Sequence, residues 1–411
     1  MEGCDLLKRP TEMLTRRSES LLAKDMAANA NRLTDVLAGK SCLVIGGAGS
    51  IGSETTLLLA QFPLSRLTII DQDENGLARL MRRLRGNALA PAAAQIDSLP
   101  MDYGSTAFFA MLRASEPYDY VLNFAALKHV RSEKQPWSIF AMMDTNILKQ
   151  SDLLSALSEA GQPFRYFSVS TDKAANPVSF MGATKRLMEH VMFTEAANVS
   201  SARFANVAYS QGSLLESFCD RLDSDTPLAA PLGIERFFFT LKEAGQMCLL
   251  TGILGETGKI YIPDLSPDEH LVSMETAAIS FLEANGYEAI AYPLEKQAEA
   301  FSDFTELKAA GKWPLILTPS DTAGEKPYEE FAGEKETVTD SAFAALKAVN
   351  YAPSNFAGGV SALSAKLRAL KLDARALSQL STDDMKAWVS EIEPDFEHRH
   401  IGSEKTLDDR I

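Results

Sequence analysis

The chain has 411 residues, of which 46% are hydrophobic and 23% charged, as in ordinary soluble globular proteins. It carries 55 acidic and 40 basic residues, a net charge of −15. This acidic balance argues against a nucleic-acid scaffold or a protein that binds anionic membranes, because both need basic surface. The sequence shows neither an apolar run long enough to span a membrane nor a secretory signal, so we expect a cytoplasmic protein without membrane insertion.

Residues 1–39 form a polar lead-in with one predicted amphipathic helix. Apolar side chains recur at helical spacing from Leu21 to Leu37, and Gly39 would end the helix. Such a helix packs either on the body of its own chain or on another subunit, and the pattern leaves both open.

Apolar runs at 41–45, 66–71, 118–126 and 165–171 predict buried strands, each followed by helical sequence. The first helix is expected from 54 to about 62. Strands that alternate with helices indicate βαβ units and a parallel sheet, and near-continuous apolar runs suit strands covered on both faces. The predicted fold class is therefore α/β, with a doubly wound parallel sheet.

The loop after the first strand has glycines in the pattern Gly-x-x-Gly-x-x-Gly, at Gly46, Gly49 and Gly52, with Ser50 and Ile51 between the last two, and it leads into the next predicted helix. Glycines there permit a tight turn and let the backbone approach a pyrophosphate, and the helix N-terminus supplies N–H groups and a positive dipole end. The strand–turn–helix context predicts a dinucleotide-binding site.

Two aspartates follow the second and third predicted strands. Asp71 ends the second strand, and a carboxylate there accepts hydrogen bonds from ribose hydroxyls and repels a 2′-phosphate. This favours NAD as the cofactor, with NADP as the alternative, although Asp71 could also cap the loop. Asp102 could hydrogen-bond an adenine amino group.

The segment from Ser168 to Ala174, Ser-Val-Ser-Thr-Asp-Lys-Ala, ends another predicted strand. Met181 and Lys185 follow, and their four-residue spacing puts both side chains on one helical face. In extended short-chain dehydrogenases, which this sequence resembles in its glycine spacing, a tyrosine and a lysine occupy such positions. Methionine cannot act as a general base. Either the enzyme is inactive or another residue takes the proton.

The stretch STDKAANPVSFMGATKR at 170–186 resembles the UDP-N-acetylglucosamine 4,6-dehydratases of bacterial polysaccharide biosynthesis, one branch of which carries methionine in place of the tyrosine. FAALKHV (124–130), RFANVAYSQGS (203–213), RFFFTLKEAGQ (236–246) and AGEKPYEE (323–330) match as well. The chain departs from the family pattern at Ala205 and in the stretch before RFFFT, which puts the identity of the substrate in doubt more than the reaction type.

The resemblance implies a set of roles. The catalytic residues would be Thr171, Asp172, Lys173, Met181 and Lys185; the cofactor-binding residues Gly46, Gly49, Ser50, Ile51, Gly52, Asp71, Asp102, Ala125 and Lys185; and the substrate-binding residues Lys128, Asn206, Arg236 and Glu325. The cofactor would be tightly bound and regenerated in each cycle. No metal is expected, because the four cysteines and five histidines show no ligand spacing.

The resemblance also implies the organisation of the chain. The expected regions are a helical N-terminal arm (1–39), a dinucleotide-binding domain (40–205), a mostly substrate-binding domain with some return to the first sheet (206–350), and a C-terminal helical segment and tail (351–411). Helices around 138–160 and 181–197 pair between subunits in this family, so we expect a homo-oligomer.

Three readings of the function remain open. The first is a UDP-N-acetylglucosamine 4,6-dehydratase. The second keeps the fold but makes the enzyme a dehydratase for a GDP- or dTDP-linked sugar, or a nucleotide-sugar 4-epimerase. The third is a dinucleotide-binding regulatory protein whose site has decayed, which Met181 suggests.

Overall fold

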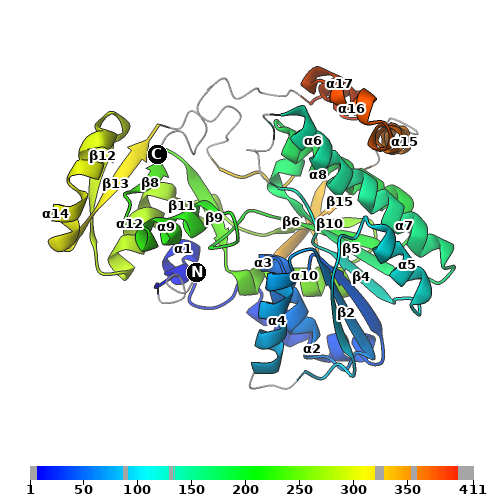
Figure 1. Cartoon of the computed structure of the whole chain (residues 1–411). Coiled ribbons are helices and arrows are strands. Elements are labelled where there is room, and N and C mark those ends of the chain that lie inside the picture. Colours follow the sequence, from blue (N-terminus) through cyan, green and yellow to red (C-terminus); the bar gives the residue numbers. More distant parts are fainter. Residues whose placement is uncertain are drawn as a thin grey trace.

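The computed structural model describes residues 7–86, 91–128, 133, 135–319, 328–352 and 359–396. A nine-stranded sheet in the order β14-β15-β10-β6-β5-β4-β1-β2-β3 dominates it (Figure 1). The strands are β1 (Ser41–Ile45), β2 (Arg66–Asp71), β3 (Ile96–Pro100), β4 (Tyr120–Asn123), β5 (Arg165–Thr171), β6 (Val199–Phe204), β10 (Lys259–Pro263), β14 (Val338–Asp340) and β15 (Leu346–Asn350). All pairs from β3 to β10 are parallel, and β14 and β15 add antiparallel edge strands. The predicted doubly wound α/β fold is confirmed.

Helices cover both faces of this sheet. On one face lie α2 (Ala23–Leu37), α3 (Ser50–Leu59), α4 (Glu74–Gly86) and α10 (Leu241–Leu254); on the other lie α5 (Thr106–Ala114), α6 (Pro136–Met143), α7 (Lys149–Glu159) and α8 (Phe180–Glu195). Strand β1 shows why its sequence is apolar from Cys42 to Ile45. Cys42 and Val44 pack in the first layer, whereas Leu43 and Ile45 pack in the second. A strand buried on both faces is typically a near-continuous apolar run, and the polar residue that begins β1, Ser41, donates its hydroxyl to the Pro117 carbonyl (3.1 Å).

A smaller lobe carries two three-stranded sheets beside the large one (Figure 1). Its elements are β7 (Asn206–Val207), β8 (Leu228–Pro231), β9 (Glu235–Phe239), β11 (Leu271–Ser273), β12 (Glu288–Pro293), β13 (Lys312–Thr318), α1 (Thr11–Thr15), α9 (Leu214–Asp223), α11 (Pro267–His270), α12 (Met274–Ala284), α13 (Gln297–Ser302) and α14 (Phe304–Ala309). The lobe has an apolar core of its own, which includes Phe218, Phe281 and Trp313. The chain enters this lobe at the carboxyl edge of the large sheet, where β6 is followed by β7.

The N-terminal helix packs on the body of its own chain. Leu33 and Leu37 of α2 are fully buried in the first core layer. The buried Asp25 carboxylate accepts hydrogen bonds from the backbone N–H groups of Ala344 and Ala345, at 2.7 and 2.9 Å. Of the two alternatives for this helix, the structure shows the first.

Several predicted boundaries differ from the observed ones, and two of them bear on the site. Strand β4 ends at Asn123, not at 126, because the Asn123 side chain accepts the Ala125 N–H (3.0 Å) and turns the chain out of the sheet. Helix α3 begins at Ser50 instead of 54, because Gly49 is its extended N-cap. Both differences lie at the carboxyl edge of the sheet, where strand and helix patterns give way to loop geometry.

The C-terminal helices α15 (Gly359–Leu372), α16 (Ala374–Ser378) and α17 (Thr382–Ile392) lie against α8 and its neighbours (Figure 1). Leu363 and Leu367 of α15 and Val389 of α17 share an apolar cluster with Leu187 of α8. The same cluster contains residues of α7 and α8, the helices that we expected to pair between subunits. The chain's own C-terminal helices therefore occupy part of the expected subunit surface.

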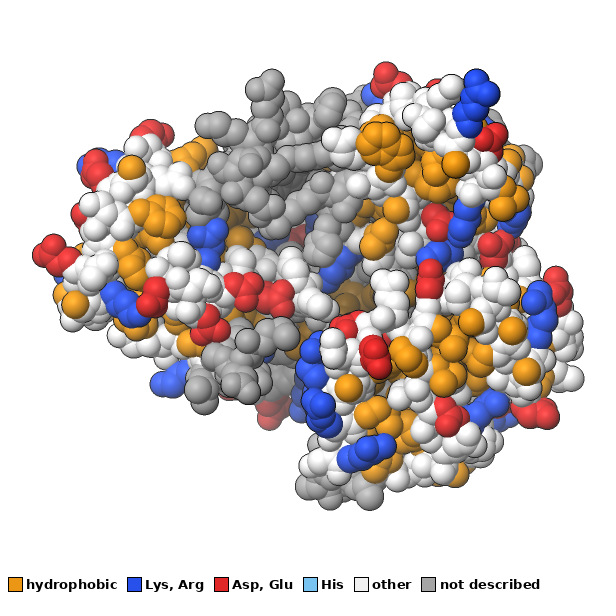
Figure 2. All heavy atoms as spheres, in the orientation of Figure 1, with side chains coloured by type: hydrophobic (Ala, Val, Ile, Leu, Met, Phe, Trp, Pro, Cys, Tyr) orange, Lys and Arg blue, Asp and Glu red, His pale blue; other side chains and the backbone are white. Residues whose placement is uncertain are grey.

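Within the described residues, no helix is both long and apolar enough to cross a membrane, and no group of side chains could ligate a metal ion. Cys42, Cys219 and Cys248 are buried free thiols, whereas Cys4 lies outside the described residues. The face in Figure 2 shows acidic and basic side chains interspersed, so the negative net charge is not gathered into one acidic surface in this view.

The packing of α15 on α8 predicts that two leucine substitutions in α15 have unequal effects on stability. Leu367 is fully buried, whereas Leu372 of the same helix is 85% exposed. Leu367→Ala should lower the free energy of unfolding by about 2–5 kcal/mol, because it removes buried methyl groups and leaves a cavity. Leu372→Ala should change it by less than about 0.5 kcal/mol. Urea unfolding of both variants tests this, and equal effects would contradict the packing described.

Candidate active site

A cavity of about 1350 Å³ opens at the carboxyl edge of the large sheet, and residues of both the sheet and the smaller lobe line it. Doubly wound sheets bind ligands at this edge, where the strand order reverses between β1 and β4. Most of the predicted site residues line it: Gly46, Gly49, Ser50, Ile51, Gly52, Asp71, Asp102, Ala125, Lys128, Thr171, Asp172, Lys173, Met181, Lys185, Asn206 and Arg236. Glu325 lies outside the described residues.

The glycine loop packs so tightly that side chains would not fit. Gly46 has a φ of +73°, and a Cβ there would lie 2.5 Å from the Ala125 nitrogen. A Cβ on Gly52 would lie 2.2 Å from the Gly46 carbonyl oxygen. At Gly49 there is more space: a Cβ there would have only the Gly46 carbonyl oxygen nearby, at 3.5 Å. Since Gly49 brings no side-chain cap to α3, the first N–H groups of the helix can receive a diphosphate, and the loop fits a dinucleotide.

Asp71 and Asp102 have partners within the chain. The Asp71 carboxylate accepts the N–H groups of Ala48 and Asp73, both at 2.9 Å, and so caps the glycine loop. Asp102 forms an ion pair with Lys149 at 2.7 Å, and this pairing together with the Gly104 N–H outweighs burial and lowers the pKa of Asp102. Both carboxyl groups line the cavity, one at the end of β2 and one just after β3.

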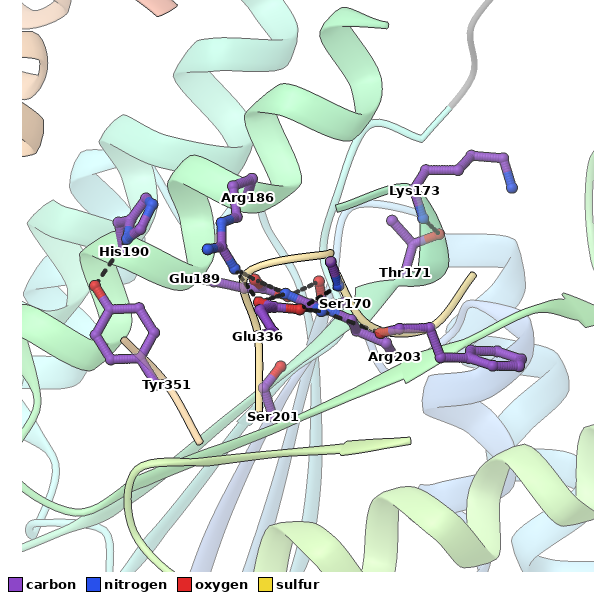
Figure 3. Close-up of polar contacts among 12 residues, drawn as sticks. Ser170, Thr171, Lys173, Arg186, Glu189, His190, Ser201, Arg203, Glu336 and Tyr351 are labelled. Carbon is purple, nitrogen blue, oxygen red and sulfur yellow. Dashed lines mark hydrogen bonds and ion pairs between the residues drawn. The ribbon is translucent and has the colours of Figure 1, made fainter. Parts of the chain in front are cut away.

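The reactive segment leaves the sheet directly after β5. The Thr171 hydroxyl donates to the Asp172 carboxylate (2.7 Å), and the Lys173 ammonium lies 3.2 Å from the same carboxylate. Asp172 is 7% exposed, whereas the Lys173 side chain is 45% exposed. Figure 3 shows Thr171 and Lys173 at the end of the strand, with the lysine directed away from the buried charges beside it. A carboxylate, an amine and a hydroxyl thus converge at one point of the cavity.

Helix α8 begins beside this segment. The buried Glu133 carboxylate accepts the N–H groups of Phe180 and Met181, at 3.0 and 2.8 Å, and caps the helix. Met181 is 5% exposed and presents a thioether to the cavity. The Lys185 ammonium donates to the Val169 carbonyl (2.7 Å). Burial lowers the pKa of Lys185 to about 8, although Glu189 opposes the shift.

A buried ion network fixes α8 against the sheet (Figure 3). Glu189 of α8 and Arg203 of β6 have no exposed side-chain surface and pair at 2.7 Å. Glu189 also accepts the Ser170 hydroxyl (2.6 Å), one residue before Thr171, and Arg203 also pairs with Glu336 (2.5 Å). Burial alone would raise the pKa of Glu189, but the arginines and the Ser170 hydroxyl lower it to about 2.

Arg186 extends this network to the C-terminal helices. It pairs with Glu189, with Glu336 at 2.6 Å and with Glu393, just beyond α17, at 3.3 Å. His190 joins the same Glu393 carboxylate to Tyr351. The C-terminal segment is thereby connected through charges to the helix that carries Met181 and Lys185.

The lobe side of the cavity is polar. Glu329 accepts a hydrogen bond from the Asn206 amide and from the Phe237 N–H (3.1 Å), and it forms an ion pair with Arg236 at 3.4 Å. The Lys128 ammonium donates to the Gln211 carbonyl at 3.0 Å. Two of the residues expected at the nucleotide diphosphate, Asn206 and Arg236, are thus held by a glutamate that was not predicted.

The profile of a family described as polysaccharide biosynthesis protein matches residues 42–350, well over half of the chain. The chain belongs to this family. Capsular polysaccharide biosynthesis protein CapD of Staphylococcus aureus is 28% identical over 261 residues, which are 61% of this chain and 41% of that protein. The chain thus spans less than half of that relative's length. A UDP-N-acetylglucosamine 4,6-dehydratase (inverting) of Campylobacter jejuni is 27% identical over 240 residues, 55% of this chain and 67% of that enzyme.

Among solved structures, Pen from Bacillus thuringiensis has a similar fold, with a TM-score of 0.59 and 20% identity over 87% of this chain and 98% of that chain. At this identity the likeness concerns the fold alone. The resemblance noted in the sequence is confirmed at the level of the family.

Sequence reasoning missed Glu329 and the buried network. Glu329 stands in the motif AGEKPYEE, from which Glu325 was chosen instead. A loop has no periodicity that shows which of its carboxylates turns inward. Arg203 and Glu189 carried a weak signal, because Arg203 stands between Ala202 and Phe204 and Glu189 directly follows Leu187 and Met188.

The buried pair predicts a large effect of neutralising Glu189. Glu189→Gln leaves Arg203 buried with one carboxylate fewer and should lower the free energy of unfolding at pH 7 by about 3–5 kcal/mol. The lowered pKa of Glu189 means that its stabilisation is present above its ordinary pKa and is lost as the pH falls toward about 2. The difference between wild type and variant should therefore shrink in acid.

Urea unfolding at pH 7 and pH 3 measures this difference. Glu283→Gln, the same exchange at an exposed position of α12, is the control and should have little effect at either pH. An equal loss in both variants, or a loss from Glu189→Gln that does not change with pH, would contradict the role assigned to the network.

Proposed function

We propose that this protein is a nucleotide-sugar 4,6-dehydratase that converts UDP-N-acetylglucosamine to the 4-keto-6-deoxy sugar nucleotide for a bacterial surface glycan. The observation that carries the proposal is the convergence of Asp172 and Lys173 in a cavity that also holds a dinucleotide-binding loop. Dehydration of a sugar between two carbons needs one base for a carbon-bound proton and one acid for the departing hydroxyl. An adjacent carboxylate and amine supply both.

The glycine loop, Asp71 and Lys185 would hold a nicotinamide dinucleotide, and their geometry fits it. When bound, this cofactor takes hydride from sugar carbon 4 and returns it at carbon 6, so it is not consumed. The Lys185 ammonium, on the α8 face toward the cavity, would hydrogen-bond the nicotinamide ribose. The Asp71 carboxylate would favour the ribose hydroxyls of NAD.

Asp172 moves one proton in this scheme. It takes the proton of the carbon 4 hydroxyl as that carbon becomes a ketone, and it delivers the proton to the carbon 6 hydroxyl, which leaves as water. The Thr171 hydroxyl, which donates to the same carboxylate, orients the carbon 4 hydroxyl toward Asp172. Met181 occupies the place of a tyrosine base but supplies only packing.

Lys173 moves a second proton. Its amine removes the proton on carbon 5, which the carbon 4 ketone acidifies, and it returns a proton to carbon 5 after water has left. Its exposure at the end of β5 lets the side chain extend toward the sugar. The sum of these steps is the loss of one water with no net oxidation.

The other readings explain fewer of the contacts. An epimerase returns the hydride to carbon 4 and has no need for an amine beside carbons 5 and 6. A decayed regulatory protein has no need to retain Thr171, Asp172 and Lys173 in hydrogen-bonding contact around a cavity of about 1350 Å³. The buried free thiols Cys42 and Cys219 support action in the cytoplasm. A homo-oligomer built through α7 and α8 would include the C-terminal helices in its interface.

Three variants test the assignment of the two protons. Asp172→Asn keeps the shape but loses the basicity and should lower turnover by about 10²- to 10⁴-fold. Lys173→Met should block elimination more than oxidation, so a 4-keto sugar with its carbon 6 hydroxyl should accumulate with reduced cofactor. Met181→Ala is the control for packing at the same site and should act much less. Product mass and nicotinamide absorbance distinguish the three.

Two results would contradict the assignment. Near-full turnover of Asp172→Asn would place the base elsewhere. A loss in folded Met181→Ala as large as in Asp172→Asn would show that position 181 has a role that this chemistry does not contain.

The cofactor has its own test. The Asp71 carboxylate lies at the loop end of β2, where it would repel the 2′-phosphate of NADP. Protein purified without added nucleotide should release mostly NAD on denaturation, as measured by enzymatic cycling assays that are specific for each dinucleotide. Recovery of NADP alone would refute the role of Asp71.

A further inference from the structure

Glu329 is a buried carboxyl group on the lobe side of the cavity, with a side chain 3% exposed. Both of its oxygens have partners. One accepts from the Asn206 amide and lies 3.4 Å from the Arg236 guanidinium, and the other accepts the Phe237 N–H at 3.1 Å. Arg236 also lines the cavity and donates to the Glu235 carbonyl (2.8 Å). The arginine that suits a diphosphate is therefore already paired with an anion.

The charges around Glu329 come from two elements. Arg236 of β9 favours its carboxylate form, as does the more distant Lys173, whereas Asp172 disfavours it. Burial is the largest influence and also favours the neutral acid, and the balance raises the pKa of Glu329 to about 7. Its chain neighbour Glu330 is exposed and accepts from the Asn176 amide (2.9 Å), so it belongs to another contact.

A diphosphate beside Arg236 changes this balance in one direction. It brings negative charge into the cavity and competes for the same guanidinium, which otherwise stabilises the carboxylate. Both effects favour the protonated form of Glu329. A neutral carboxyl group could still accept the Phe237 N–H while leaving the guanidinium to the ligand.

We propose that Glu329 is a proton-linked gate for the diphosphate site: it pairs with Arg236 as a carboxylate in the free protein, and it takes up a proton from solvent when a nucleotide sugar binds. The inference rests on the proposed function, because it assigns the ligand as a nucleoside diphosphate. It makes Glu329 a positioning residue that acts through Arg236 and Asn206.

Proton uptake by Glu329 predicts how the affinity for the ligand depends on pH. Below pH 7 Glu329 is already protonated in the free protein, so the affinity should not depend on pH through this group. Above about pH 7 each bound ligand costs the uptake of a proton, and the dissociation constant should rise about tenfold for each pH unit. Lys185, whose pKa is about 8, is another titrating group that lines the cavity, so a variant is needed to assign the slope.

The test measures binding by isothermal titration calorimetry to the full chain between pH 6 and pH 9. The probe is the 4-deoxy analogue of UDP-N-acetylglucosamine, which has the full diphosphate but no carbon 4 hydroxyl to oxidise. Wild type should show the slope above pH 7, and titrations in two buffers of different ionisation enthalpy should show uptake approaching one proton at pH 8. Glu329→Gln should bind without the slope, and Glu330→Gln, the same exchange one residue away, should keep it.

The outcomes separate the two proposals. Wild type that binds the analogue with no pH dependence and no proton uptake overturns the gate, whether or not Glu329→Gln folds, and leaves the dehydratase proposal standing if UDP-N-acetylglucosamine is converted. A slope that persists in Glu329→Gln also overturns the gate and assigns the proton to Lys185 or another group. Absence of binding at every pH overturns the gate together with the UDP ligand.

Discussion

The Arg203–Glu189 pair lies at the centre of the molecule with no side-chain surface exposed to solvent, between the large sheet and α8. Two charges cannot be buried without compensation, because each loses its hydration. Here Glu336, Ser170 and Arg186 provide further hydrogen bonds and charges, which offset the free energy lost when the two charges leave water. The pair therefore requires several distant segments to be in place at once.

Those segments also carry the residues to which the proposed function assigns roles. Ser170 precedes Thr171 on β5, and Glu189 lies one turn beyond Lys185 on α8. The network thus fixes the end of the strand against the face of the helix, and both line the cavity. Through Arg186 and Glu393 the same network holds the C-terminal helices, which cover α8 where a partner subunit was expected.

The cavity has a different kind of polar group at each of its two ends. At one end, the glycine loop offers backbone N–H groups; at the other, Arg236 offers a guanidinium that Glu329 already holds. Between them lie Asp172 and Lys173, the pair to which the proposed function assigns the two proton transfers. Met181 adds an apolar side chain to the same cavity, and the proposal therefore assigns the acid–base steps to the carboxylate and the amine.

The sequence predicted what depends on neighbours along the chain. The strand β1, the glycine loop and the run from Ser170 to Lys173 are local patterns, and their place at one sheet edge follows from the parallel topology. Glu329 could not be singled out from the sequence, because the stretch AGEKPYEE has no periodicity that shows which of its side chains is buried. The docking of Leu367 on α8 could not be predicted either, since it joins segments far apart in the chain and depends on tertiary packing.

The measurement that tests the central claim most directly is the reaction of the wild-type protein with UDP-N-acetylglucosamine in deuterated water, followed by mass spectrometry and NMR of the product. Deprotonation at carbon 5 and loss of the carbon 6 hydroxyl predict a product that lacks one water and carries a solvent deuterium at carbon 5. A product of unchanged mass, with carbon 4 inverted and no deuterium at carbon 5, would contradict the account and make the protein an epimerase.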